Sequence, residues 1–503
     1  MRRVLFAGLI LTVAVACRPA AQSVAAAESS SEAVGKIPIT TRSEEARALL
    51  LRGRALNENL QPHEAHALFQ QAVALDSSFA FGEYSLAATS PTAKEIAMHL
   101  QKALALSDGA SPGERMLILA FQARSHGDPE RARELADSLV ALYPKDERAH
   151  WTLGNACSAQ QNYECAIAEF RAAIAINPKY SLAYNQLGYA FRGAGQMAAA
   201  ETAFRQYIEL VPDDPNPYDS YGELLMKAGR FDESIAQYRK ALSIDEHFTG
   251  SFVGIAANEM YAGRYDAAVA ESERYFSVAR DDRERRAALL TLAMTYVDQG
   301  ATAKALRTME RREAIARASS DSVNMSADGV LIAHILLEAG RIDAARDRFT
   351  KAHASLAASS VAAELKEDDA LGSRYDAARV ALAAGDVRSA RVEAQAYEAG
   401  ARLRRNDVRI REAHELNGLV ALAESRFAES LAELSRADQQ NPAVLSAMAR
   451  AQAGRGESSK ATELTSAARH MNILPTFPYV FTRASLAAAT GSATSGSAGG
   501  TPR

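Results

Sequence analysis

The sequence predicts an all-α fold, an α-solenoid of stacked helical pairs, because three series of residue types return with the same period of 34 positions. The first series is alanine or serine, the second is a small residue, and the third is proline. The three sets are Ala132, Ala166, Ala200, Ser234 and Ala268; Ala120, Gly154, Gly188, Gly222 and Ala256; and Pro144, Pro178 and Pro212. A period of this length is typical of stacked units, none of which buries its apolar face alone.

Each repeated residue type has a physical role in a pair of antiparallel helices. In the unit from 147 to 180, Gly154 and Ala166 are small where the two helices must cross closely, and Tyr163 and Phe170 are predicted to fill the space beside them. In later units a glycine falls where the first helix must end in a left-handed residue. These glycines are Gly195, Gly229 and Gly263.

The residues from Ala149 to Asn155, from Tyr163 to Phe170, and Asn177-Pro178 resemble the tetratricopeptide repeat. The resemblance covers residues 113–280. It implies helix-turn-helix repeats, about 11 to 12 over the whole chain, that stack into a right-handed superhelix. It also implies that the first helices line a concave groove that binds a peptide or a partner protein.

The repeat pattern divides the chain into parts. We predict regular repeats over 43–280, divergent repeats over 281–410, C-terminal repeats over 411–470, and a capping segment with a disordered tail over 471–503. The capping segment is expected to lie against the last repeat and to lead into a short helix near 481–488.

The divergent repeats are predicted to be longer than the regular ones. Their turn glycines are 37, 40 and 45 positions apart, so insertions of 3, 6 and 11 residues are expected as longer helices or loops. The glycines are Gly263, Gly300, Gly340 and Gly385.

Residues 1–16 are predicted to be a signal peptide, with a basic start and an apolar run from Val4 to Ala16. A helix of this length spans about 20 Å, less than the roughly 30 Å hydrocarbon core of a bilayer. The run ends Ala-Val-Ala before Cys17, which resembles a bacterial lipoprotein box and implies lipidation of Cys17; ordinary signal cleavage with an incidental Cys17 is the alternative. We expect residues 17–42 to be a lipidated, disordered linker.

These features predict an exported, membrane-anchored lipoprotein of the cell envelope that faces the periplasm or the exterior. Its only contact with the membrane would be the lipid anchor.

The composition does not favour nucleic acid or a cofactor. The formal net charge is −4 and the pI is near 6.3, so the chain lacks the basic footprint of nucleic-acid binders. No catalytic or phosphate-binding motif occurs, and we expect no catalytic residue, no cofactor and no metal site. His63 and His66 share a helix face, but a solvated pair is favoured over a metal site.

Two cysteines flank the turn of one predicted pair. Cys157 precedes the turn and Cys165 follows it, so their side chains are able to face each other. A disulfide is one interpretation, which an oxidising compartment would permit. The other is that Cys157 is a small core residue and Cys165 a partly exposed thiol.

The resemblance assigns candidate partner-binding positions to the groove side of the first helices. They are Trp151, Asn155, Asn185, Tyr189, Arg192, Asp219, Glu223, Met226 and Tyr261. Rings beside amides and single charges suit peptide recognition, although Trp151 and Tyr189 are also candidates for packing between units. The favoured function is a non-enzymatic scaffold of the bacterial cell envelope. The alternatives are an assembly factor for outer-membrane or polysaccharide export machinery, or an enzyme with a site hidden in residues 281–410.

Overall fold

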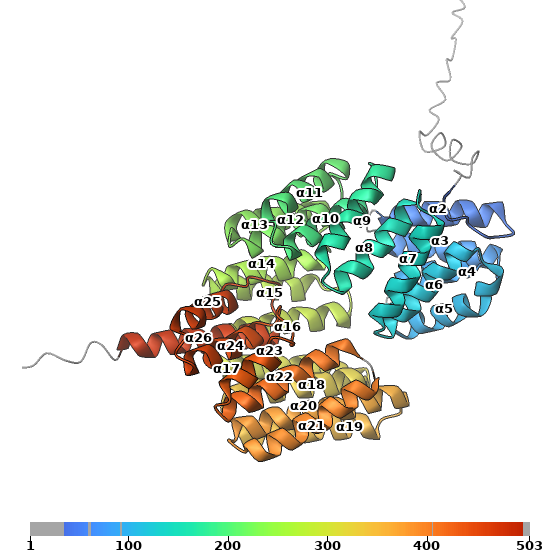
Figure 1. Ribbon diagram of the computed structural model, residues 1–503. Helices are drawn as coiled ribbons and strands as arrows, with labels where there is room; N and C mark the ends of the chain where they lie inside the picture. Colours follow the sequence, from blue (N-terminus) through green and yellow to red (C-terminus); the bar gives the residue numbers. More distant parts are fainter. Residues whose placement is uncertain (1–34, 59–61, 91–92, 405, 496–503) are drawn as a thin grey trace, which may run out of the picture.

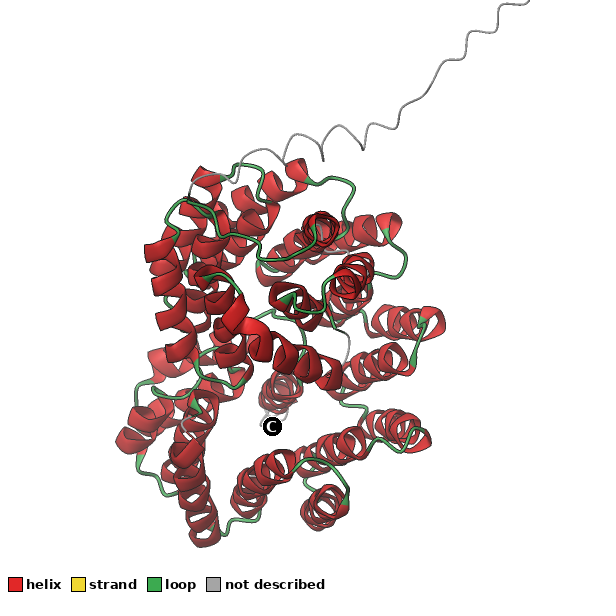
Figure 2. Cartoon of the chain, turned by 90° about the vertical axis from the view of Figure 1, so that its right-hand side faces the viewer, coloured by secondary structure: helices red, strands yellow, loops and turns green. Residues whose placement is uncertain are grey.

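The structure, a computed structural model, describes residues 35–58, 62–90, 93–404 and 406–495. Within these ranges the chain forms 25 α-helices, one short 3₁₀ turn at Ser107–Gly109 and no strand (Figures 1 and 2). Helices α2 to α25 follow one another as twelve antiparallel pairs, and α26 comes last. The predicted all-α solenoid of repeats is confirmed.

The first seven pairs are built from short helices of 10 to 15 residues. Their bounds are α2 (Glu44–Glu58), α3 (Pro62–Leu75), α4 (Ala80–Thr89), α5 (Ala93–Leu106), α6 (Pro112–Ser125), α7 (Pro129–Leu142), α8 (Glu147–Ala159), α9 (Tyr163–Ile176), α10 (Ser181–Gly193), α11 (Met197–Leu210), α12 (Asn216–Lys227), α13 (Phe231–Ile244), α14 (Thr249–Tyr261) and α15 (Tyr265–Val278).

The next seven helices are longer, at 17 to 21 residues each. The remaining bounds are α16 (Asp282–Asp298), α17 (Thr302–Ala318), α18 (Ser322–Glu338), α19 (Ile342–Ala358), α20 (Ala363–Ala383), α21 (Val387–Arg404), α22 (Asp407–Ala423), α23 (Phe427–Leu434), α24 (Pro442–Gly454), α25 (Ser458–Arg469) and α26 (Phe477–Ser495). The insertions expected from the glycine spacing are therefore taken up by longer helices.

A glycine on the first helix packs against an aromatic ring on the second helix of the same pair. An ideal Cβ on Gly154 would lie 2.5 Å from the ring of Phe170, and one on Gly188 would lie 2.6 Å from the ring of Phe204. Phe170 and Phe204 have no exposed surface. The predicted close crossing of small residue and ring is present, and it leaves no room for a side chain at the glycine.

From α6–α7 to α24–α25, where the structure describes the whole turn inside each pair, that turn ends the first helix with a residue in the left-handed region. Glycine holds this place in most pairs, including Gly195, Gly229 and Gly263 with φ of 74° to 76°, as predicted. Gln161 and Ser425 occupy the equivalent turns with φ of 57° and 58°. The sequence pattern therefore marks the turn even where glycine is absent.

Residues 35–42 are ordered and lie along the turns between the first pairs. Ile37 N–H donates to Asp146 Oδ2 at 2.7 Å, and Thr40 N–H donates to Glu114 Oε1 at 2.8 Å. Arg42 N–H donates to Asp76 at 2.8 Å. The three carboxylates are buried and satisfy the backbone donors of the segment.

The prediction of a disordered linker over 17–42 is therefore wrong for residues 35–42, while residues 17–34 lie outside the described residues. The physical reason is that Ile37 is only 3% exposed and fills a space in the N-terminal core beside Leu117 and Leu139. Burial of one large aliphatic side chain contributes about 1.5 to 3 kcal/mol, enough to help order a short segment.

The Gly188→Ala substitution should lower the free energy of unfolding by about 1 to 3 kcal/mol, because the new methyl group overlaps the ring of Phe204. Urea denaturation followed by circular dichroism measures the change. Gly372→Ala is the matched control: Gly372 lies within α20 with no other side chain within 4 Å of an added Cβ, so alanine should raise stability by up to about 1 kcal/mol. Equal effects of the two substitutions would contradict the packing argument.

Candidate functional site

The first helices of the pairs form a continuous surface, which we call the inner face. At its N-terminal end, helices α2, α4, α6 and α8 border a cavity of about 730 Å³. Each of these helices contributes two residues one turn apart, and such residues lie on the same side of a helix. They are Leu50 and Arg54, Tyr84 and Ala88, Leu117 and Phe121, and Trp151 and Asn155.

The opposite wall of the cavity comes from a distant part of the chain. Asn406, Asp407, Val408 and Arg411, at and just before the start of α22, line it. The turn between α6 and α7 lies next to this wall, because an ideal Cβ on Gly127 would lie 3.5 Å from Asn406 Nδ2. The solenoid therefore curves until its eleventh pair approaches its third.

Arginines outnumber carboxylates in the cavity wall by four to three. Arg54, Arg124, Arg148 and Arg411 line it, and the carboxylates that line it are Glu58, Glu130 and Asp407. Burial lowers the pKa of Arg54, and the positive charge of Arg148 lowers it further. Burial also acts against the charge of Arg148, but hydrogen bonds to Asp146 raise the pKa of Arg148 overall. The guanidinium groups of Arg54 and Arg148 therefore lie close enough in this wall for their charges to interact.

Trp151 combines the two roles considered for it. The side chain is half-buried and packs against Tyr180 and Ala183 at the start of the next pair, yet it also lines the cavity. Its indole N–H is buried and has no hydrogen-bond partner among the described residues. Asn155 lies one turn further along, and its amide donates to the Trp151 carbonyl at 2.9 Å.

In the middle of the inner face, the predicted groove residues bind one another. Arg192 Nη1 donates to Glu223 at 2.5 Å, and Tyr189 O–H donates to Glu223 at 3.1 Å. Asn185 donates to the side chain of Asn216 at 3.3 Å. These contacts join α10 to α12, so the side chains hold neighbouring repeats together.

Asp219 continues this polar network to α14. Its carboxylate accepts a hydrogen bond from Ser251 Oγ at 2.8 Å. Burial raises the pKa of Asp219 to about 7, and the nearby charge of Glu223 acts in the same direction. The network therefore contains a carboxyl group that is partly protonated near neutral pH.

The C-terminal segment covers the last predicted groove residues. Met226 has no exposed surface and Tyr261 is 9% exposed, and both pack in one cluster with Met471 and Tyr479. Tyr261 O–H donates to the Ile473 carbonyl at 2.6 Å. At these positions the inner face is filled by residues of the same chain.

Two further contacts hold the C-terminal segment in place. Lys227 Nζ donates to the Met471 carbonyl at 2.7 Å. Arg483 forms an ion pair with Asp298 of α16 at 2.8 Å, and its guanidinium lies 4.6 Å from the ring centroid of Tyr261.

The capping segment was expected to lie against the last repeat and to lead into a short helix near 481–488, but helix α26 is longer, with 19 residues. Helix α26 begins at Phe477 and contacts α24 and α25, but it also contacts α16 (Figure 1). The reason is that α16 presents a buried carboxylate and an apolar surface beside the last pair, so the segment bridges two parts of the array.

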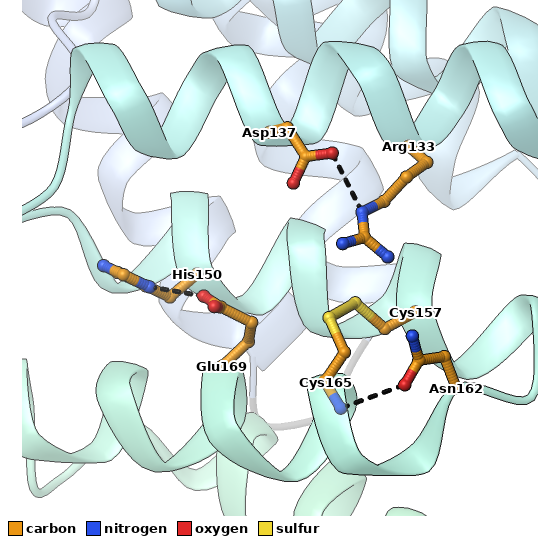
Figure 3. The surroundings of a disulfide bond; sticks show 7 residues. All are labelled: Arg133, Asp137, His150, Cys157, Asn162, Cys165 and Glu169. Carbon is orange, nitrogen blue, oxygen red and sulfur yellow. Dashed lines mark hydrogen bonds and ion pairs between the residues drawn. A yellow bond between two sulfur atoms is a disulfide. The ribbon is translucent and has the colours of Figure 1, made fainter.

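Cys157 and Cys165 are joined in a disulfide across the turn between α8 and α9 (Figure 3). Their Cα atoms are 5.8 Å apart, and the Cys165 N–H donates to Asn162 Oδ1 at 3.2 Å. Cys157 packs in the same core cluster as Phe170. The bond therefore fixes the end of the helix that carries Trp151 and Asn155.

A cluster of histidines and aspartates lies in the divergent repeats. His353 forms ion pairs with Asp369 and Asp376, each at 3.0 Å, and His334 pairs with Asp376 at 3.2 Å. Burial opposes protonation of His353, but hydrogen bonds to Asp376 and Asp369 raise its pKa overall. None of the four side chains lines the cavity described above, and no group of three or more His, Cys, Asp or Glu in the described ranges is arranged to hold a metal ion. The cluster links α18, α19 and α20.

Sequence reasoning found two of the cavity residues and missed the others. The positions of the cavity residues follow a pattern in the sequence. Trp151 lies three residues before Gly154, the small residue of its helix, and Asn155 lies one residue after it. The same positions around the small residues at 53, 87 and 120 give the other three pairs of cavity residues. The wall from α22 had no such signal. Cys17 and the side chain of His63 lie outside the described residues.

Comparison with known families finds the tetratricopeptide repeat at residues 122–181, 159–217 and 185–247. The chain therefore carries tetratricopeptide repeats in this region. Similar solved structures include TTC0263, a thermophilic TPR protein of Thermus thermophilus, with 22% identity, 42% of this chain and 98% of that chain covered, and a TM-score of 0.28. MamA is similar with 21% identity, 39% of this chain and 94% of that chain covered, and a TM-score of 0.24. MamA 41-end from Desulfovibrio magneticus RS-1 is similar with 14% identity, 33% of this chain and 93% of that chain covered, and a TM-score of 0.29. No curated protein matches the chain significantly.

The Asp298→Ala substitution should release the C-terminal segment, because it leaves the guanidinium of Arg483 without its buried partner. The expected cost is on the order of 2 kcal/mol, so trypsin should cleave after Arg469 or Arg483 faster than in the wild-type protein. Asp343→Ala is the control, since Asp343 pairs with Arg346 at an exposed position. Unchanged cleavage in Asp298→Ala would show that the ion pair does not hold the segment.

Proposed function

We propose that the chain is a non-enzymatic scaffold of the cell envelope that binds a partner protein at the N-terminal part of its inner face. Tetratricopeptide repeats at residues 122–247 suggest a protein–protein interaction scaffold. The observation that carries the proposal is the division of the inner face. The N-terminal part presents a cavity of about 730 Å³, whereas the middle and C-terminal parts are occupied by the chain's own side chains and by residues 471–483.

The location in the envelope is supported by two features. The signal-like start and Cys17 favour export and lipidation, although they lie outside the described residues. The disulfide between Cys157 and Cys165 is a bond that persists in oxidising compartments. A search of the described residues finds no helix with the length and apolar character to cross a membrane.

The enzyme alternative requires a reactive cluster that faces a cleft. The His334–Asp376–His353 cluster is in the expected region, but its groups pair with one another between helices and do not line the cavity. The scaffold is therefore favoured. An assembly factor for envelope machinery is a narrower form of the same proposal.

A photo-crosslinking amino acid at Asn155 tests the scaffold in intact cells. Asn155 is half-buried in the cavity wall, so a partner that binds there should be captured as one discrete adduct. The matched control is the same amino acid at Gln206, an exposed residue on second helix α11, where no adduct is expected. Adducts at both positions, or at neither, would count against a partner at the N-terminal inner face.

The anchor is tested with Cys17→Ser. The wild-type protein should incorporate labelled fatty acid and fractionate with membranes, because several acyl chains give stable membrane binding at about 0.8 kcal/mol per buried CH₂. The serine variant should do neither. Equal labelling of the two proteins would exclude lipidation at Cys17.

A further inference from the structure

We propose that the N-terminal cavity binds a small organic anion with an aromatic body, such as an aromatic carboxylate, sulfonate or phosphate. This inference goes beyond the scaffold role, because it concerns a free ligand and holds whether or not a partner protein binds nearby. It is carried by the ring lining of the cavity, by the four guanidinium groups that line it beside three carboxylates, and by the side-chain contacts that link the next first helices.

The size and lining of the cavity suit an aromatic body. A volume of about 730 Å³ lies within the range of roughly 300 to 1,000 Å³ typical of small-molecule sites. Phe81 and Tyr84 stack with ring centroids 5.0 Å apart, and Tyr84 meets the edge of Phe121 at 5.6 Å. Trp151 lines the same space. Rings of this kind present faces and edges to which another aromatic ring packs favourably.

The lining carries four arginines and three carboxylates, a balance that favours an anion over a cation. Arg124 and Arg411 form no ion pair with any residue that the structure describes, and neither do the carboxylates Glu130 and Asp407. The guanidinium of Arg124 instead lies 5.2 Å from the ring centroid of Phe121. Arginine beside an aromatic ring is suited to hold a carboxylate, sulfonate or phosphate in two hydrogen bonds.

Buried donors without partners point the same way. Arg148 Nη1 and Trp151 Nε1 are buried and lack a hydrogen-bond partner among the described residues. Of the carboxylates that line the cavity, Glu58 lies 3.6 Å from Arg54, while Glu130 and Asp407 stand on α7 and α22. A buried donor without a hydrogen bond costs about 1 to 3 kcal/mol of free energy. An acceptor on a ligand would offset that cost.

The positive charges of two arginines act on the same ring of the lining, that of Tyr84. Burial raises the pKa of Tyr84, and the charges of Arg124 and Arg148 both act to lower it. Arg148 also acts on Arg54. Three arginines from α2, α6 and α8 therefore contribute to the lining, and Glu58 and Asp146 offset part of their charge.

The shape of the inner face favours a compact ligand over an extended chain. Beyond Asn155 the polar side chains of α10 and α12 are paired with one another, in the Arg192–Glu223 ion pair and in the hydrogen bond between Asn185 and Asn216. The C-terminal segment fills the face after that. An extended peptide that ran from the cavity along the repeats would therefore find few unpaired polar side chains for its backbone.

The test uses the full chain and two dyes that differ in charge. The anion 8-anilinonaphthalene-1-sulfonate should bind with 1:1 stoichiometry and quench Trp151, the sole tryptophan, because Trp151 lines the cavity. The neutral N-phenyl-1-naphthylamine, which has the same aromatic body, should bind at least about tenfold more weakly, as expected for loss of a charge-assisted contact. Equal binding of the two dyes would overturn the proposal.

Substitutions locate the anion. Arg124→Gln and Arg411→Gln should each weaken binding of the sulfonate at least about fivefold and leave binding of the neutral dye unchanged. The control Arg131→Gln removes the same charge from α7, where Arg131 pairs with Glu134 at an exposed position, and should change neither. Circular dichroism confirms that each variant is folded. If both Gln variants bind the sulfonate as tightly as the wild-type protein, these arginines do not form the site.

Competition with unlabelled anions identifies the source of the ligand. N-acetylphenylalanine should displace the sulfonate dye, and its neutral amide should not. A twelve-residue Gly-Ser peptide that ends in phenylalanine carries the same carboxylate and ring on a polypeptide. It should compete at least about tenfold less well, because ordering its flexible chain costs free energy and the polar side chains beyond Asn155 are already paired. Equal competition by the peptide would show that the cavity accepts a polypeptide terminus and would overturn the assignment to a small ligand.

Discussion

The close crossing of the two helices in each pair is the constraint on which the rest of the structure depends. Where Gly154 faces Phe170 and Gly188 faces Phe204, no side chain fits between glycine and ring. The ring then fills the space that the glycine leaves, at the high density typical of protein interiors. Because the same contact returns in pair after pair, the pairs stack with similar spacing, and their first helices form one continuous face.

That inner face is only partly available to other molecules. In the middle, polar contacts such as the ion pair of Arg192 with Glu223 link neighbouring pairs to each other. Farther on, the C-terminal segment supplies Tyr479 and the carbonyl oxygen of Ile473 as an internal partner. The array therefore binds a piece of itself at α12 to α16 and leaves the part of its face at α2 to α8 as the place for an external ligand.

Electrostatics sets the N-terminal cavity apart from the middle of the face. At Asp219 and Glu223 two carboxylates lie near one arginine, and burial raises the pKa of Asp219. In the cavity four arginines stand beside three carboxylates, and the pKa of Arg54 is lowered by burial and by the charge of Arg148. A surplus of positive charge favours binding of an anion. The same scaffold thus places different chemistry in different repeats through the residues one turn apart on each first helix.

The sequence by itself determined the repeated part of this protein. The positions of Gly188, the ring of Phe204 and the left-handed turn at Gly195 follow from contacts within one repeat, so a period of 34 residues reveals them. The same register placed Trp151 and Asn155 on the inner face, and extended backward it would have included Arg54.

Only the tertiary structure decided which distant parts meet. The approach of α22 to the turn at Gly127, the docking of residues 471–483 on α12 to α16 and the order of residues 35–42 had no signal in the period. The physical reason is that these contacts depend on the small rotation between neighbouring pairs, summed over many repeats. Each rotation is set by the packing of many side chains at once, and no local pattern of residues records the sum.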